Sequence, residues 1–261
     1  MKEVEVDSKK STLEVTKRLY VTSNISQSNQ IVLNTKNNNH PVIINGSHLI
    51  SDVSNNVCFG TDSLRASTDY DDLVIFANGS NNVAFGNDTL KVCTGSDNTA
   101  IGYGAGDSTV LASKTVIIGS GAGSGVLTSD ADGCVLIGSD AGKDLTEGNH
   151  TILIGYHAGQ SLTETDGNTM IGYNAGVYTA GTPTDAQNNT FIGDEAGKFN
   201  TTGKHSTFIG ALSGTGITGT RITGSSNTCV GYKSGNVIQG DANYNTYIGV
   251  KAGGDSTSAS S

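Results

Sequence analysis

The sequence predicts an all-β fold, a parallel β-roll or β-helix solenoid of about eleven coils. Three observations predict it: one short motif recurs eleven times, a glycine anchors each copy, and β-branched residues fill fixed columns before that glycine. Most spacings between anchors are 16 to 21 residues, and 17 is the commonest. A propeller blade needs ~40 residues, so stacked coils fit better. The anchors are Gly60, Gly86, Gly102, Gly119, Gly138, Gly155, Gly172, Gly193, Gly210, Gly231 and Gly249.

Two columns of each motif predict the core strand. The residue before the anchor is Ile in eight copies, Phe in two and Val in one, and the residue two positions earlier is always Val, Ile or Thr. Alternate residues of a strand share one face, and β-branched side chains suit a buried pleated surface. We therefore expect these two columns, Ile171 among them, to point inward.

The residue between those two columns is mostly apolar as well, and it occupies the opposite strand face. A strand that is apolar on both faces is buried on both faces, and an exposed apolar column of this length marks an interface. We expect this middle column to point outward and to join three copies of the chain, with one wider monomeric core as the alternative. The column holds Cys58, Ala84, Ala100, Ile117, Leu136, Leu153, Met170, Phe191, Phe208, Cys229 and Tyr247.

The remaining positions predict corners and a ladder. Gly stands four residues after the anchor in nine copies, and Leu64 and Leu90 replace it in the first two, which predicts a corner with positive φ. Asn opens the motif in seven copies and can form a hydrogen-bonded ladder. Helices are not expected, because no segment keeps a 3.6-residue period. A second apolar point predicts a shorter second strand, and it is occupied by Leu111, Leu127, Leu145, Leu162, Phe199, Ile217 and Ile238.

The motif pattern NTxIGYxAG resembles the head repeats of trimeric autotransporter adhesins, the YadA-like β-roll, and the related repeats of phage and large-virus fibres. The resemblance covers about residues 55–253. It implies a homotrimer of parallel rolls with a role in surface attachment. The adhesins carry a secretion signal and a membrane anchor that this sequence lacks, and their shortest repeats are shorter than these coils, so we expect the viral class.

Composition divides the chain into three parts. Residues 1–50 contain denser Lys and Glu and almost no Gly, which predicts an attachment or β-shaft segment that docks to other virion proteins. Residues 51–253 form the repeat domain, and residues 254–261 are a polar tail. The longest segments between motifs, Val177–Asn189 and Thr215–Asn227 with Arg221, are expected to meet a host receptor or glycan, since loops on a rigid scaffold carry recognition.

Charge and hydropathy exclude two kinds of partner. The formal net charge is −9 without a basic stripe, so nucleic-acid binding is not expected. No run of ~18 apolar residues is present, so membrane insertion is not expected either.

The sequence offers no catalytic, cofactor or metal site, and we expect a protein that is not an enzyme. The five His residues are not paired at metal-ligand spacing. Gly119–Gly125 lacks the helix that a phosphate loop requires, and Asp130 with Asp132 lacks the other ligands of a calcium loop. The four Cys residues are interpreted as small core or interface residues. The His residues are His40, His48, His150, His157 and His205, and the Cys residues are Cys58, Cys93, Cys134 and Cys229.

The resulting hypothesis is a trimeric fibre or spike on a virion surface, for host attachment or particle decoration. A bacterial adhesin head on a cell surface is the alternative. An ice-binding solenoid is less favoured, because the Thr column is expected to point inward. A polysaccharide-degrading β-helix enzyme is not favoured, because no acidic pair stands out.

Overall fold

The computed structural model describes residues 56–59, 63–64, 79–180, 185–217, 219 and 221–254. Residues 1–50, expected to form the attachment segment, lie outside them, as does the polar tail apart from Gly254. The described part contains eleven three-residue strands. They are β1 (Val57–Phe59), β2 (Val83–Phe85), β3 (Thr99–Ile101), β4 (Val116–Ile118), β5 (Val135–Ile137), β6 (Ile152–Ile154), β7 (Thr169–Ile171), β8 (Thr190–Ile192), β9 (Thr207–Ile209), β10 (Thr228–Val230) and β11 (Thr246–Ile248).

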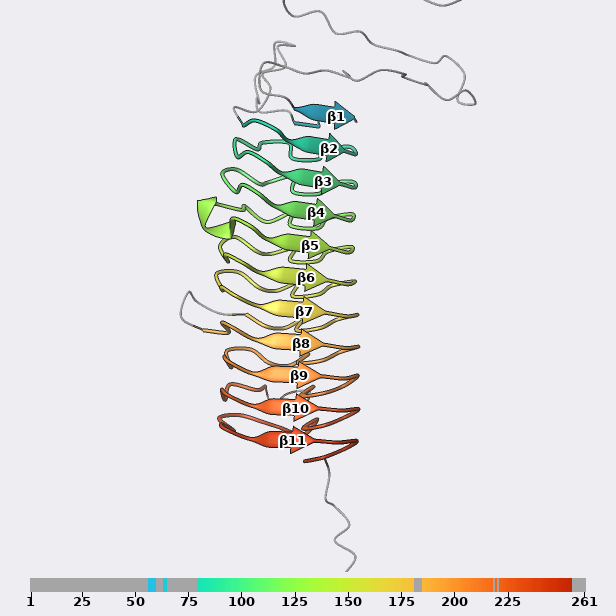
Figure 1. The fold of residues 1–261 in the computed structure, drawn as a ribbon, viewed down its shortest axis with the longest axis vertical. Helices are drawn as coiled ribbons and strands as arrows, with labels where there is room; N and C mark the ends of the chain where they lie inside the picture. The colour runs from blue at the N-terminus through green and yellow to red at the C-terminus, as the bar shows by residue number, and fades with distance from the viewer. Residues whose placement is uncertain are drawn as a thin grey trace, which may run out of the picture. The chain divides into compact units, whose positions relative to one another are not determined.

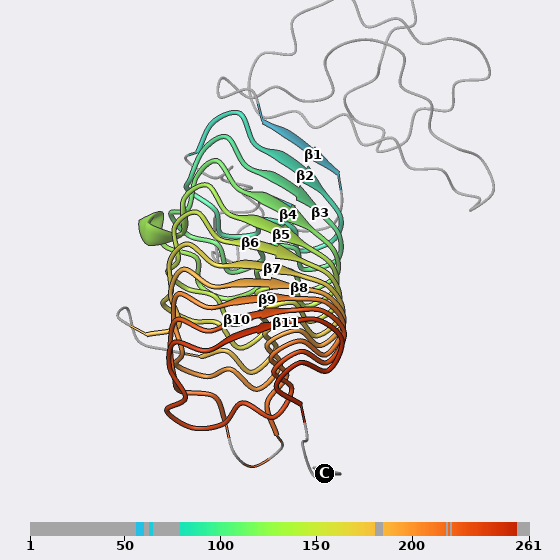
Figure 2. The same ribbon diagram turned by 60° about the horizontal axis from the view of Figure 1, so that its bottom comes forward.

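All eleven strands form one parallel sheet in sequence order, one strand from each coil (Figure 1). The register is constant, since the first residue of each strand pairs with the first residue of the next, as in Ile152 with Thr169. The rest of each coil passes round a shared interior and returns to the sheet one step further along (Figure 2). The predicted β-solenoid is therefore confirmed, and the one helical turn in the described part is the 3₁₀ turn η1 (Ser129–Ala131).

The prediction of the strand faces was wrong: the middle column points inward, and the Val/Thr and Ile columns point outward. The middle residues of β2–β10 are all 0% exposed, whereas their strand neighbours are half-buried or exposed. On β7, for example, Met170 is buried while Thr169 and Ile171 are partly accessible. The expected inward position of Ile171 is corrected accordingly. An alternating strand with apolar residues on both faces does not itself say which face is inside.

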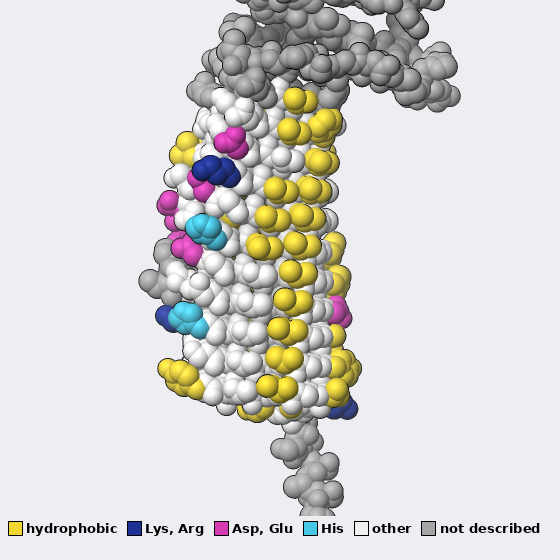
Figure 3. Space-filling model, in the orientation of Figure 1, with side chains coloured by type: hydrophobic (Ala, Val, Ile, Leu, Met, Phe, Trp, Pro, Cys, Tyr) yellow, Lys and Arg dark blue, Asp and Glu magenta, His cyan; other side chains and the backbone are white. Residues whose placement is uncertain are grey.

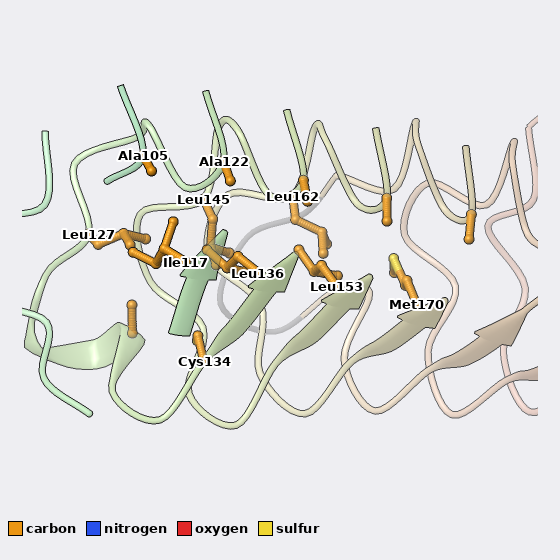
Figure 4. Packing of buried hydrophobic residues seen from close by; sticks show 14 of the residues in the cluster. Ala105, Ile117, Ala122, Leu127, Cys134, Leu136, Leu145, Leu153, Leu162 and Met170 are labelled. Atoms are coloured by element: carbon orange, nitrogen blue, oxygen red, sulfur yellow. The ribbon is translucent and has the colours of Figure 1, made fainter. Parts of the chain in front are cut away.

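The opposite wall of the core comes from the corners of the coils. The Ala residues that stand three after the anchor, such as Ala105 and Ala122, are 0% exposed and face the strand residues across the interior (Figure 4). The interior is narrow, so one strand side chain, one small corner residue and, in some coils, one further apolar residue fill each layer.

The second apolar point contributes to this core, but it does not form the predicted second strand. Within the described residues, the segment of the coil that carries the second apolar point contains only isolated β-bridges, such as Asn200 with Ile222. Leu127, Leu145 and Leu162 are 0% exposed, whereas Leu111 is 52% exposed and Ile217 is 38% exposed. The segment that carries this apolar residue varies in length from coil to coil, so the side chain does not always reach the core.

Side-chain size explains why two corners carry Leu instead of Gly. A Cβ on Gly197 would lie 2.5 Å from the ring of Phe191. A coil with a large residue in the middle of its strand therefore requires glycine at this corner. Where the strand residues are only Ala84 and Ala100, Leu90 fills the space and is 0% exposed despite a φ of 47°. The corners therefore have positive φ as predicted, and core volume decides which residue occupies them.

The predicted Asn ladder is present and buried. The Oδ1 atoms of Asn56 and Asn82 accept hydrogen bonds from the backbone N–H of Asn82 and Asn98 in the next coil, at 2.8 and 2.9 Å. The same bond recurs near the other end of the rod, from Ser206 N–H to Asn189 at 2.9 Å. The Nδ2 atoms donate to backbone carbonyls, as Asn98 does to Ala112 at 2.9 Å. The ladder thus satisfies buried backbone groups between coils.

We expect Asn98→Ala to destabilise the rod by roughly 2–4 kcal/mol, because it leaves buried partners without hydrogen bonds. Asn98 Oδ1 accepts from the N–H and the hydroxyl of Thr115, at 3.0 and 2.7 Å. Urea unfolding of this variant beside Ser120→Ala, a change at an exposed position, measures the effect. The role of the ladder is contradicted if both variants keep the wild-type midpoint.

Candidate functional site

The outward face of the sheet carries an extended apolar surface. We call it the sheet-face stripe and define it as the first and third residues of strands β2–β11. Its third residues form a continuous apolar column along the sheet, and its first residues add a second apolar column beside β4–β6 (Figure 3). The third residues are Phe85, Ile101, Ile118, Ile137, Ile154, Ile171, Ile192, Ile209, Val230 and Ile248, and the first residues are Val83, Thr99, Val116, Val135, Ile152, Thr169, Thr190, Thr207, Thr228 and Thr246.

No charged residue interrupts the stripe over these ten strands. Its side chains are accessible in the single chain: Phe85 is 38% exposed, Ile101 is 42% exposed and Ile209 is 38% exposed. The strand residues recur at the ~4.8 Å spacing of a β-sheet, so the surface is flat and periodic. An uncharged apolar surface that extends over so many coils is typical of an interaction site.

Aromatic residues widen the stripe on the side where each strand ends. Tyr103, Tyr156, Tyr173 and Tyr232 each follow an anchor glycine and are 45–65% exposed. The rings of Tyr156 and Tyr173 are stacked, with centroids 5.5 Å apart. Tyr side chains combine apolar area with a polar hydroxyl, and they are enriched at interfaces.

The structure does not bring the histidines together. His157 contacts Asp140, with Nε2 3.4 Å from Oδ2, and stacks on Tyr156. His150 and His205 are exposed on separate coils. His40 and His48 lie outside the described residues. In the described ranges no three His, Cys, Asp or Glu side chains are grouped as metal ligands would be.

The glycine-rich and acidic segments have structural roles. Gly119–Gly125 begins at the end of β4 and continues as a turn of the coil. Asp130 lies in η1, where its N–H donates to the Thr128 hydroxyl, and Asp132 Oδ1 accepts from the N–H of Ser113 at 2.6 Å.

Asp132 belongs to a second ladder that the sequence did not lead us to expect. In six of the described coils, the residue two positions before the ladder position has a side-chain oxygen that accepts from the N–H of the equivalent residue in the preceding coil. The bonds run from Ser80 N–H to Ser96 at 2.9 Å and from Ser96 N–H to Ser113 at 3.1 Å. The signal was a column of mostly short oxygen-bearing residues beside the Asn column, interrupted at Gln187 and Lys204. Together the two ladders fix the coil spacing on which the sheet-face stripe depends.

The described cysteines are all core residues, which also corrects the outward position expected for Cys229 in the middle column. Cys93, Cys134 and Cys229 are free thiols and are 0% exposed. Burial raises the pKa of Cys134 to about 11 and that of Cys229 to about 12, so both are held as unreactive thiols. The side chain of Cys58 lies outside the described part.

The two long segments that were expected to carry recognition are described in part. Tyr178 stacks on Phe199 of the following coil, with centroids 5.4 Å apart, and it is 42% exposed. Arg221 is exposed in the second segment. Asn200 begins the Asn-Thr-Thr pattern of a glycosylation sequon, but it is 0% exposed, so its amide is closed to modification in the folded rod.

The fold and this surface define a class, a parallel β-solenoid with one accessible apolar sheet face. Within the described residues no helix is of a length and hydropathy that would let it cross a membrane. Comparisons of the chain with protein-family models, with curated proteins and with solved structures found no match.

Proposed function

We propose that the chain is a non-enzymatic structural rod that associates through the sheet-face stripe into a homotrimeric fibre or spike of a virus. The observation that carries this proposal is the stripe itself, an accessible apolar surface without charge along ten strands. The argument for association still holds after the strand faces are corrected. The interface is now proposed on the first and third strand residues, because the middle column forms the core. The resemblance of the repeat to trimeric fibre and adhesin heads supports three copies and surface attachment.

The area of the stripe suits a stable interface. Nine steps of ~4.8 Å between β2 and β11, and four residues of ~3.3 Å across, give a patch of roughly 600 Å². In a trimer, three such patches around one axis bury roughly 1,800 Å² in total, on the scale of specific interfaces. A partner that matches a flat surface repeating every ~4.8 Å is another rod of the same repeat, which is why we assign the stripe to further copies of this chain.

We therefore expect the native protein to sediment at about 80 kDa, three times the 26.7 kDa of one chain. Ile137→Asp places a charge in the stripe and should release 26.7 kDa protomers, because a buried unpaired carboxylate opposes association. The matched control is Leu111→Asp, at an apolar residue that is 52% exposed outside the stripe. A wild-type protein that stays monomeric at all concentrations would refute the proposal.

The remaining parts of the chain receive complementary roles in this proposal. Residues 1–50 dock to other virion proteins, and the segments around Tyr178 and Arg221 face a receptor or glycan. Deleting residues 1–50 should prevent incorporation into particles while the rod still folds. Normal incorporation of the truncated rod would assign attachment to another part of the chain.

One observation favours a second candidate function, ice binding. The Thr column was expected to point inward, yet Thr169, Thr190 and Thr207 lie on the accessible face of the flat sheet. An ice-binding face must meet water, so this function and burial of the stripe exclude each other. Thermal hysteresis that is lost in Thr190→Val/Thr207→Val would establish it, and absence of hysteresis in the native protein would remove it.

A further inference from the structure

The sheet-face stripe changes its composition along the rod. On β4–β6 both outward positions are aliphatic, and the first residues there are Val116, Val135 and Ile152. From β7 to β11 the first position is Thr in every strand, while the third remains Ile or Val. Figure 3 shows this change as paired apolar columns beside β4–β6 and a single column beside the later strands.

The two halves respond differently to burial. An aliphatic side chain gains free energy when it leaves water, whereas a Thr hydroxyl must find a hydrogen-bond partner or retain water. Interfaces concentrate their affinity in a fully desolvated centre, and the contacts around it contribute little. The continuous aliphatic block on β4–β6 has the composition of such a centre. The Thr half has the composition of a hydrated part of the interface.

A threefold assembly already requires parallel copies, and the asymmetry of the stripe favours the same orientation. If two rods lie antiparallel with full overlap, the aliphatic strands β4–β6 face the Thr strands β7–β9, and hydroxyls are desolvated against methyl groups. If they lie parallel and in register, aliphatic residues meet aliphatic residues and Thr hydroxyls meet Thr hydroxyls, which can hydrogen-bond with one another. An antiparallel pair centred on β5 would match the aliphatic blocks, but it would leave the last strands without a partner.

We propose that β4–β6 is the dry centre of the interface, and that the copies join through it in parallel and in register, with β7–β11 as a hydrated extension. This inference rests on the proposed self-association. It assigns the specificity of assembly to six side chains: Val116, Ile118, Val135, Ile137, Ile152 and Ile154.

The test compares two triple variants with opposite chemistry on the same face. Val116→Thr/Val135→Thr/Ile152→Thr extends the Thr column into the aliphatic block, and it should raise the concentration at which the assembly dissociates about 100-fold or more. Thr190→Val/Thr207→Val/Thr228→Val makes the opposite change and should tighten assembly. All six positions point outward, so the core is left intact. Sedimentation velocity over a concentration series gives the dissociation concentrations, and thermal melting at low concentration checks folding.

The outcomes separate this inference from the proposed function. If the wild type assembles but the first triple variant dissociates no more readily, β4–β6 is not the centre and the inference is overturned. The inference also fails if the second triple variant weakens assembly as much as the first. A wild-type protein that never assembles overturns both proposals.

Orientation has its own measurement. A spin label at Val250→Cys, which is 73% exposed beside β11, should give label-to-label distances below ~20 Å in a parallel assembly. Full antiparallel overlap would separate the labels by roughly 40 Å, so a distance of that size overturns the orientation. The buried thiols of Cys93, Cys134 and Cys229 are protected from the label, and Cys58→Ala removes the fourth.

Discussion

Phe191→Asp is expected to unfold the rod, whereas Ile192→Asp at the adjacent position leaves the single chain folded. Phe191 is 0% exposed, and its ring stacks on Phe208 of the next coil with centroids 4.9 Å apart. Its loss removes about 3–5 kcal/mol of packing, and the buried carboxylate adds several kcal/mol more, which together approach the whole stability of a domain. Ile192 points outward, so its carboxylate stays hydrated in the protomer.

Circular dichroism and thermal melting at low protein concentration measure this difference in folding. Sedimentation adds the second half of the comparison, because Ile192→Asp should dissociate the assembly without unfolding its protomers. Equal melting temperatures for Phe191→Asp and the wild type would mean that the middle column is not the core. A protomer unfolded by Ile192→Asp would contradict the outward position of the Ile column.

Gly155→Ala is expected to have the next largest effect, at least ~3 kcal/mol. Gly155 has a φ of 136°, which L-residues rarely adopt, and a Cβ there would lie 2.3 Å from the carbonyl oxygen of Gly172 in the following coil. This oxygen belongs to the backbone, so the clash can be relieved only by separating two coils. Because each coil contacts only its neighbours, such a gap divides the stack.

Gly104→Ala is the matched control for this prediction. Gly104 has a φ of 61°, but a Cβ there would meet no atom within 4 Å, so the expected cost is only about 1 kcal/mol. Denaturant midpoints of the two variants measure the difference. If both substitutions shift the midpoint equally, conformational strain explains the anchor glycines and close stacking of the coils does not.

A rigid stack is also what the proposed fibre requires. The Asn ladder and the second ladder hydrogen-bond most neighbouring coils of the described rod, as from Asn98 N–H to Asn82 and from Ser96 N–H to Ser113. These bonds hold the outward residues in a fixed register, so that a flat surface is presented for association. Variation in the segments between motifs then changes what the rod displays without disturbing its core.

The sequence alone determined the solenoid, its glycine corners and its Asn ladder. Each of these follows from repetition, because a residue type that recurs at one point of every coil must satisfy the same local geometry in each. The anchor glycines and the positive-φ corners after them are of this kind, as is the column that contains Asn82 and Asn98.

Only the tertiary structure decided which face of the strand is inside. Two apolar columns that alternate along a strand are equivalent by periodicity, and the choice depends on how the chain turns at the anchor glycine and on which side chains fit against the Ala corners. The sequence did hold a clue: the first strand position is Thr in six copies, and the middle position never is. A hydroxyl tolerates the solvent-exposed face, whereas Phe191 and Leu136 fill the narrow interior, and this difference leaves the Ile column on the accessible face.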